Sequence, residues 1–240
     1  MITPSPNPSG AAPAIILVHG WGFGPGFWHP LLSHWPVTAI RVNLGFFGRQ
    51  HLPERPEGPW IGVGHSLGFL WILREMERTG GSLPKERCLG LASINGFSRF
   101  SRQADFPAGV PGRVLERMRT ALTQDPGATL AAFRRQSGLE PSAPPQAPGI
   151  KTHHERLDAG LSWLATWDGR ATLRTSAIPL LALAARDDAI VPQAMTEAAF
   201  AGLSGDRFKI HWAEVGGHTL PLTQPALCAT TLQGFFEAGS

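Results

Sequence analysis

The sequence predicts an α/β fold built around a mostly parallel sheet. Short, continuous apolar runs alternate with segments of helical periodicity, and such runs suit strands that are buried on both faces of a parallel sheet. The chain has 240 residues, of which 42% are hydrophobic and 16% are charged. This length and composition allow one sizeable core and argue against global disorder, so we expect one domain with an insertion.

The expected elements follow from these runs in chain order. Strands are predicted at residues 14–18, 37–42, 60–64, 88–94, 180–185 and 208–215. Helices are predicted at residues 27–35, 67–79, 192–203 and 221–236. The link between two of the strands contains Pro53, Pro56 and Pro59, and proline removes a donor and clashes inside a helix. We therefore expect a mostly irregular loop there.

An insertion interrupts the strand rhythm between residues 97 and 173, where helical, arginine-rich segments follow one another. A turn-rich stretch at residues 140–149 divides them. Apolar residues at helical spacing form two stripes, which indicates helices that bury one face. The stripes are Val110, Val114, Leu115, Met118 and Leu122, and then Leu157, Leu161 and Leu164. We expect residues 1–96 and 174–240 to form the α/β core and residues 97–173 to form a helical cap.

Cysteine usage and the N-terminal segment bear on the compartment. Cys88 and Cys228 fall in apolar segments, so buried thiols in a reducing compartment are expected rather than a disulfide. The N-terminal segment lacks a basic region and has only a short apolar run, which argues against a signal peptide or a membrane span. A cytoplasmic monomer without membrane association is expected. The net charge of +3 comes without a nucleic-acid motif, so no nucleic-acid partner is expected.

The pentapeptide GHSLG at residues 64–68 is a G-x-S-x-G motif between an expected strand and an expected helix. Its glycines permit a turn so tight that the serine is held in a strained, exposed position at the sheet edge. The alternative is a serine that only caps the following helix. The context favours Ser66 as a nucleophile.

A serine hydroxyl is a weak nucleophile at neutral pH, so a histidine must accept its proton and an acid must orient that histidine. Asp187 and Asp188 follow the strand at 180–185, and His218 follows the last strand on a glycine turn. The order serine, acid, histidine is the one that a G-x-S-x-G elbow requires. We choose Asp188 as the acid, although either aspartate could be a surface acid, one of them paired with Arg186. His218 could alternatively be a loop histidine bonded to the backbone.

Acyl transfer also needs donors for the oxyanion of the tetrahedral intermediate. One candidate is the backbone amide of Leu67, directly after the nucleophile, and the other is the amide of Trp21 in the loop after the first strand. His19 is expected to fix that loop, and His65 to pack beside the nucleophile. No residues have metal-site spacing, and the mechanism needs no cofactor.

These motifs make the chain similar to the α/β-hydrolase superfamily over nearly its whole length. Within it, the chain resembles the pimeloyl-acyl-carrier-protein methyl ester esterase family of biotin synthesis. The resemblance rests on HGWG at 19–22, GHSLG at 64–68, DAIVP at 188–192, GGHTLPLTQP at 216–225 and an insertion that looks like the helical cap of that family.

The resemblance implies a serine esterase with a substrate site that includes Trp21, Leu67 and Phe133, the last in the acyl channel. The chain departs from the family in three places: a shortened N-terminal part, the proline-rich link, and the loop at residues 43–48. None touches the expected triad. They indicate a different rim to the substrate entrance.

The charge is unevenly distributed along the chain. From Phe97 to Thr175 there are eleven Lys and Arg against seven Asp and Glu, an excess of +4, while the other residues sum to −1. An acidic acyl carrier protein would be steered toward such a cap. The expected contacts are Arg113, Arg117, Arg134 and Arg135; a solvated helix face is the alternative.

We therefore expect a carboxylic ester hydrolase that forms an acyl-enzyme on Ser66 and acts on a methyl ester of a dicarboxylyl chain carried by acyl carrier protein. One alternative keeps the triad but acts on small free esters, thioesters or carbon–carbon bonds next to a carbonyl. Another is a non-catalytic protein that binds a small molecule under the cap. Loss of a triad member would favour the binding protein, and none is missing.

Overall fold

The computed structural model describes residues 12–139 and 149–237, so the expected turn-rich stretch lies almost wholly outside the described residues. Its centre is a six-stranded sheet in which every neighbouring pair is parallel. The order across the sheet is β2-β1-β3-β4-β5-β6. The strands are β1 (Ala14–Val18), β2 (Ala39–Val42), β3 (Trp60–His65), β4 (Cys88–Ile94), β5 (Leu180–Ala185) and β6 (Phe208–Ala213). The predicted α/β fold is confirmed.

The strand order reverses between β1 and β3. After β1 the chain adds β2 on one side, and it then returns to add β3 on the other side. Open α/β sheets place ligands in the crevice outside the carboxyl ends of the strands at such a reversal. The loop at residues 19–22 follows β1 and Ser66 follows β3, so the crevice opens between these two segments.

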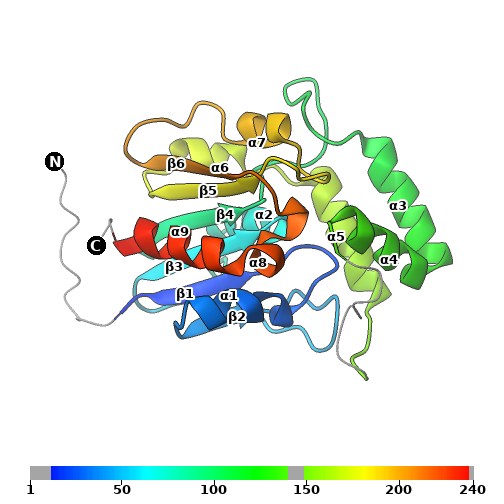
Figure 1. Cartoon of the computed structure of the whole chain (residues 1–240), viewed down its shortest axis with the longest axis horizontal. Helices are drawn as coiled ribbons and strands as arrows, with labels where there is room; N and C mark the ends of the chain where they lie inside the picture. Colours follow the sequence, from blue (N-terminus) through cyan, green and yellow to red (C-terminus); the bar gives the residue numbers. More distant parts are fainter. Residues whose placement is uncertain (1–11, 140–148, 238–240) are drawn as a thin grey trace.

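Helices cover both faces of the sheet (Figure 1). Alternate strand residues point to opposite sides, so Ile16 belongs to one apolar core and Leu17 to the other. The Leu17 face carries η1 (Pro25–Trp28), α1 (His29–His34), α8 (Leu220–Thr223) and α9 (Pro225–Glu237). The Ile16 face carries α2 (Leu67–Glu77), α6 (Arg170–Thr175) and α7 (Gln193–Ala199).

Three further helices lie beyond one end of the sheet, to the right in Figure 1. They are α3 (Gly112–Gln124), α4 (Pro126–Gln136) and α5 (His154–Thr166), and α3 packs against both α4 and α5. Leu115 and Leu122 of the first predicted stripe are buried, as are all three leucines of the second. The expected boundary at residue 173 falls inside α6, because Leu173 is buried in the core where α6 contacts α2.

Several element ends differ from the expected ones. The last helix divides into α8 and α9, since Pro225 cannot donate its amide to the preceding turn and instead begins α9. The helix expected from residue 192 ends at Ala199, followed by turns up to residue 203. Between β2 and β3 the proline-rich link contains a 43–51 bridge but no helix, as predicted.

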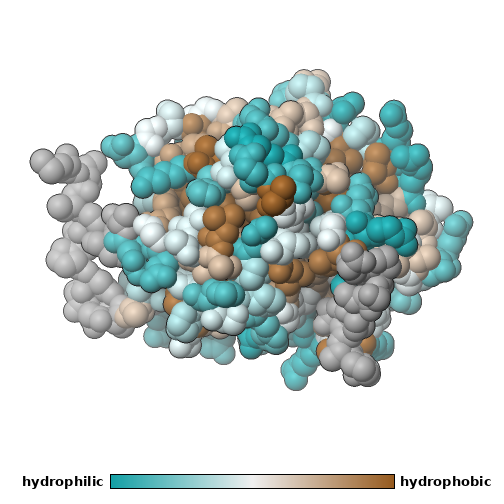
Figure 2. Space-filling view, viewed as in Figure 1, coloured by the Kyte–Doolittle hydropathy of each residue, from teal (hydrophilic) through white to brown (hydrophobic). Residues whose placement is uncertain are grey.

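Cys88 and Cys228 are buried free thiols, as predicted. In the described part of the chain, no helix is long and apolar enough to cross a membrane. On the face shown in Figure 2, apolar side chains form small patches among hydrophilic ones.

Candidate active site

Ser66 lies in a tight turn between β3 and α2. Its φ angle is 53°, in the left-handed region that is uncommon for residues other than glycine. A Cβ at Gly64 would lie 2.3 Å from the backbone of Phe69, so the turn requires glycine there. A Cβ at Gly68 would lie 2.1 Å from the carbonyl oxygen of Val18. The close approach of α2 to β1 therefore holds Ser66 at the carboxyl edge of the sheet, which is the geometry that the motif predicts.

His218 connects Ser66 to Asp188 through hydrogen bonds. Nε2 of His218 lies 3.0 Å from Oγ of Ser66, and Nδ1 lies 2.8 Å from Oδ2 of Asp188. The side chains come from the loops after β3, β5 and β6, and each residue is 5% exposed or less. An ionised carboxylate only accepts hydrogen bonds, so Nδ1 carries the imidazole proton and Nε2 accepts from the serine hydroxyl.

The two adjacent aspartates have different partners. Oδ1 of Asp188 accepts the backbone amides of Ile190 at 2.7 Å and Val191 at 2.9 Å, which leaves Oδ2 for the histidine. Asp187 accepts the amides of Gly216 and Gly217, in the loop that carries His218. Asp187 therefore orders the histidine loop rather than the histidine ring.

The alternative in which Asp187 or Asp188 pairs with Arg186 is not seen. Arg186 instead bonds Glu214 at 3.1 Å and Gln193 at 2.9 Å.

Asn95 is a site residue that the sequence analysis missed. Its Nδ2 donates to Oδ2 of Asp188 at 2.9 Å and to the carbonyl oxygen of Gly217 at 2.6 Å. Its Oδ1 accepts the amide of Ala185 at 3.2 Å. With a φ of 47°, Asn95 holds the loops after β4, β5 and β6 together. Its only signal in the sequence is an Asn-Gly pair after a predicted strand, a pair that marks a turn.

His19 fixes the loop after β1, as expected. Its Nδ1 donates to the carbonyl oxygen of Gly20 at 2.9 Å, and its Nε2 accepts the amide of Leu44, in the loop after β2, at 3.2 Å. Burial lowers the pKa of His19 to about 4, although hydrogen bonds to Gly20 and Asn43 oppose the shift. This imidazole is therefore neutral at physiological pH.

His65 packs beside Ser66, also as expected. Its Nε2 donates to the carbonyl oxygen of His218 at 2.8 Å, and its ring centroid lies 4.4 Å from that of Phe27. Burial is the largest cause that holds the pKa of His65 well below its ordinary value, followed by repulsion from His218. A Cβ at Gly20 would lie 2.8 Å from Nδ1 of His65, so the first strand's loop passes directly over this ring.

The two amides proposed for the oxyanion lie in the loop after β1 and at the start of α2. In the described residues, neither the Trp21 amide nor the Leu67 amide donates to a protein acceptor. Trp21 also reaches the inserted helices: its indole Nε1 donates to the carbonyl oxygen of Leu157 in α5 at 2.8 Å. Its ring stands edge-on to Phe133, with centroids 4.9 Å apart.

A cavity of about 340 Å³ opens beside Ser66, between the sheet edge and the inserted helices. This volume lies in the range of small-molecule sites, about 300–1,000 Å³. Trp21 and Phe133 line it, whereas Leu67 is fully buried and is not part of the lining. Most of the remaining lining is apolar, including Phe100, Val110, Val114, Leu115, Met118, Leu164 and Ile190.

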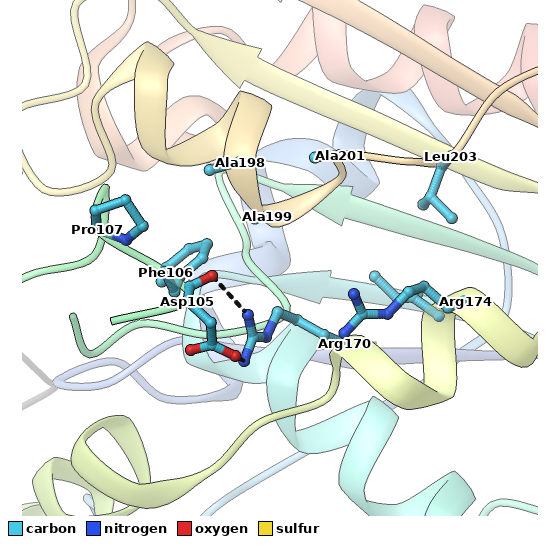
Figure 3. A pocket seen from close by; sticks show the side chains of 10 residues that line it. Asp105, Phe106, Pro107, Arg170, Arg174, Ala198, Ala199, Ala201 and Leu203 are labelled. Atoms are coloured by element: carbon cyan, nitrogen blue, oxygen red, sulfur yellow. Dashed lines mark hydrogen bonds and ion pairs between the residues drawn. The ribbon is translucent and has the colours of Figure 1, made fainter. Parts of the chain in front are cut away.

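A second cavity, of about 220 Å³, lies between α6, the end of α7 and the loop at residues 105–107 (Figure 3). It shares no lining residue with the first cavity. Arg170 crosses it and donates to Asp105 at 2.7 Å and to Asp168 at 2.7 Å, so its charge is compensated. The lining contains no serine, histidine or cysteine, so it offers no nucleophile for acyl transfer.

The four arginines expected to dock a carrier protein differ in exposure. Arg113 and Arg117 on α3 and Arg135 on α4 are exposed. Arg134 is only 8% exposed, and burial lowers its pKa. Arg134 is thus unsuited to contact an external protein, a correction to the expected set. In the described residues, no group of three or more His, Cys, Asp or Glu is arranged to hold a metal ion.

The parallel sheet, the turn at Ser66 and the order of the site residues along the chain define the α/β-hydrolase class. An esterase from Exiguobacterium antarcticum has the same fold, with a TM-score of 0.79 and 15% identity over 95% of this chain and 93% of its own. No protein-family model matches the chain.

Sequence relatives define the family more closely. The pimeloyl-[acyl-carrier protein] methyl ester esterase of Stenotrophomonas maltophilia is 30% identical over 95% of this chain and 94% of its own length. The biotin biosynthesis bifunctional protein BioHC of Cellvibrio japonicus is 28% identical over 94% of this chain, which spans only 48% of that longer protein. The chain therefore belongs to the pimeloyl-[acyl-carrier protein] methyl ester esterase family, and it is a carboxylic ester hydrolase.

Proposed function

We propose that this chain hydrolyses pimeloyl-[acyl-carrier protein] methyl ester, a methyl ester of a dicarboxylyl chain, and so acts in biotin biosynthesis. The observation that carries the proposal is the continuous line of hydrogen bonds from Asp188 through His218 to Ser66, at the wall of an apolar cavity. The choice of this substrate rests on the names of the relatives that match nearly the whole chain.

In the first half of the reaction, Oγ of Ser66 attacks the carbonyl carbon of the ester while Nε2 of His218 takes the hydroxyl proton. The oxyanion of the tetrahedral intermediate accepts hydrogen bonds from the amides of Trp21 and Leu67. The intermediate then collapses, the bond to the methoxy oxygen breaks, and His218 returns the proton to release methanol. Asp188 stabilises the imidazolium throughout.

In the second half, water attacks the acyl-enzyme carbonyl as His218 takes a proton from it. Collapse of this second intermediate breaks the bond to Oγ of Ser66, and His218 gives the proton back to that oxygen. The products are a free carboxylate and the original enzyme. Because the serine, the histidine and backbone donors carry every step, the scheme needs no metal or organic cofactor.

The cavity supports a substrate with an extended apolar chain. Trp21 and Phe133 lie beside Ser66, and α3, α4 and α5 close the space above the sheet edge. We propose residues 97–173 as the cap over the site and the remaining residues as the catalytic core. Leu67 would contribute its backbone amide to the substrate rather than a side-chain contact, since it is fully buried.

Exposed positive charge on the cap supports docking of an acidic carrier protein. Arg113, Arg117 and Arg135 are exposed and form no ion pair with another described residue. Rim charges of this kind raise the rate of association with an oppositely charged partner. We also propose that the chain is a monomer and that it is cytoplasmic; the two buried free thiols support the cytoplasmic location, because they fit a reducing compartment.

One experiment tests the proposed ester hydrolysis and the proposed identity of the substrate separately. The protein is mixed with methyl pimeloyl-carrier protein, with monomethyl pimelate and with short simple esters, and the products are followed by mass spectrometry. Preferred demethylation of the carrier-bound ester is expected, and Ser66→Ala is expected to abolish it. Hydrolysis of the simple esters alone would reject the substrate but keep the chemistry. Failure of a fluorophosphonate to label Ser66 in the folded protein would reject the chemistry and favour a binding protein.

A further inference from the structure

The apolar cavity beside Ser66 has a positive charge in its wall. Among the described residues that line the cavity, Arg102 is the single charged side chain, and no acid accompanies it there. Arg102 belongs to the segment that joins β4 to α3 and that forms one side of the cavity. Ser66 and Trp21 line the same cavity. A substrate bound at Ser66 therefore shares a mostly apolar cavity with a cation.

Local hydrogen bonds hold Arg102 in this place. Its backbone amide donates to the carbonyl oxygen of Val110 at 2.8 Å, and its Nε donates to the carbonyl oxygen of Gly109 at 3.1 Å. Val110 and Gly109 themselves line the cavity. A Cβ at Gly109 would lie 2.7 Å from the Arg102 amide nitrogen, so the backbone segments at residues 102 and 109 are in close contact. The guanidinium is thus anchored through one nitrogen.

The terminal amino groups of Arg102 have no acceptor among the residues that the structure describes. Neighbouring arginines of the insertion differ in this respect, because Arg99 and Arg170 bond Asp168 and Arg119 bonds Asp158. Arg102 therefore combines an uncompensated charge, free donors and a position on the cavity wall. Its side chain is open to solvent, so a ligand can reach it.

We propose that Arg102 determines substrate specificity by binding an anionic group of the substrate that lies remote from the scissile ester. Arginine presents a planar fork of N–H donors that matches carboxylate and phosphate oxygens. The anion is a free carboxylate if the substrate is a dicarboxylate monoester, or the phosphate of the carrier arm if it is carrier-bound.

This inference rests on the proposed function, because the ester must lie at Ser66, and one of its two substrate pairs is an activated ester that does not depend on the methyl group. The first pair of substrates is 4-nitrophenyl hydrogen pimelate and its neutral analogue with the far carboxylate capped as an amide. The second pair is the methyl pimeloyl thioesters of 4′-phosphopantetheine and of pantetheine. Each pair differs only in the remote anion.

The readout is the ratio of kcat/KM for the anionic member to that for the neutral member. Arg102→Gln is expected to lower this ratio about tenfold, mainly through KM, because a hydrogen-bonded charge pair is lost. Arg102→Lys keeps the charge without the planar fork and is expected to give an intermediate ratio. The matched control is Arg156→Gln, an exposed arginine on α5 that does not line the cavity, and it should keep the ratio of the unmodified protein.

The outcomes distinguish a carboxylate from a phosphate as the anion, and they test the role of Arg102 separately from the proposed substrate. A lowered ratio in the first pair alone assigns a carboxylate, and a lowered ratio in the second pair alone assigns the phosphate. An unchanged ratio in both pairs would overturn the inference. If that unchanged ratio came with equal losses of kcat/KM on the anionic and neutral members, it would mean that Arg102 only holds the 100–110 loop in shape. Failure of methyl pimeloyl-carrier protein as a substrate, with the ratios still lowered, would reject the proposed substrate and keep the role of Arg102.

Discussion

Asn95 Nδ2 lies 2.9 Å from Oδ2 of Asp188, the oxygen that also accepts the hydrogen bond from His218. The same amide group bonds the backbone carbonyl of Gly217, directly before His218. One side chain from the end of β4 thus fixes both the acid and the loop that carries the histidine. We infer that Asn95 is a positioning residue for the proposed catalytic acid.

The first prediction follows from this arrangement. Asn95→Gly removes the amide but keeps the left-handed backbone free of strain, so kcat should fall about ten- to hundredfold as a charged hydrogen bond is lost. Asn95→Ala should lose as much activity and should also be less stable than the glycine variant by about 1 kcal/mol, because alanine is strained at a φ of 47°. Steady-state kinetics and thermal unfolding measure the two effects separately. Full activity in Asn95→Gly would contradict the positioning role.

The sequence could predict the residues at the strand ends but not what connects them. Ser66, Asp188 and His218 follow apolar runs in the order that a G-x-S-x-G elbow requires, and parallel strands bring such ends to one edge. Asn95 also follows such a run. The contacts of Asn95, however, depend on how far β4, β5 and β6 extend relative to one another at the sheet edge, and the sequence does not specify this register.

The error at Arg134 has a different origin. The prediction used the positive charge of Arg134 alone, whereas helical spacing indicates that this residue lies on the buried face of its helix. Arg134 lies four residues after Leu130, so the two share a helix face, and that face is buried. The tendency of long charged side chains to lie along apolar surface explains how an arginine can occupy it. Arg135, one position further, points away and is exposed.

The second prediction concerns the two aspartates. Asp188→Asn should lower kcat by orders of magnitude, because an amide in place of the carboxylate no longer fixes the histidine tautomer. Asp187→Asn should lower it much less, since Asp187 bonds only the backbone amides of Gly216 and Gly217. Kinetics of both variants on one simple ester provide the comparison. If Asp187→Asn were the more damaging change, Asp187 would have to be the acid.

The third prediction is a pH dependence of stability. His19 has a pKa of about 4 in the folded protein and 6.5 as its ordinary value, so the unfolded chain binds this proton first as pH falls. The contribution of neutral His19 is therefore present above pH 6.5 and is lost as pH falls toward 4. Between pH 7 and pH 5 the loss amounts to about 2 kcal/mol in the free energy of unfolding.

Urea unfolding at the two pH values checks this assignment. His19→Gln cannot bind the proton, so its stability should change by about 2 kcal/mol less over the same interval than that of the unmodified protein. The matched control is His211→Gln, at an exposed position on β6, which should keep the full pH dependence. Identical pH dependence in His19→Gln and the unmodified protein would show that other groups cause the loss of stability at acidic pH.

The fourth prediction tests the docking surface with the exposed arginines only. The double variant Arg117→Glu and Arg135→Glu should reduce kcat/KM for carrier-bound ester about tenfold or more, because reversed charges slow association with an acidic partner. Small free esters should be hydrolysed as before, since neither side chain lines the cavity. Raising the salt concentration should mimic the substitutions in the unmodified protein, as exposed charges are screened over about 10 Å at roughly 0.1 M salt.

Arg134→Glu serves as the contrasting variant, since a reversed charge at a buried position should destabilise the fold and reduce hydrolysis of all substrates together. Thermal unfolding and kinetics on both substrate classes separate this effect from docking. Equal losses on carrier-bound and free esters in the double variant would mean that Arg117 and Arg135 maintain the cap. Turnover of the carrier-bound ester that is independent of salt would remove the electrostatic basis for docking, because an exposed cationic surface cannot steer an acidic partner without responding to screening.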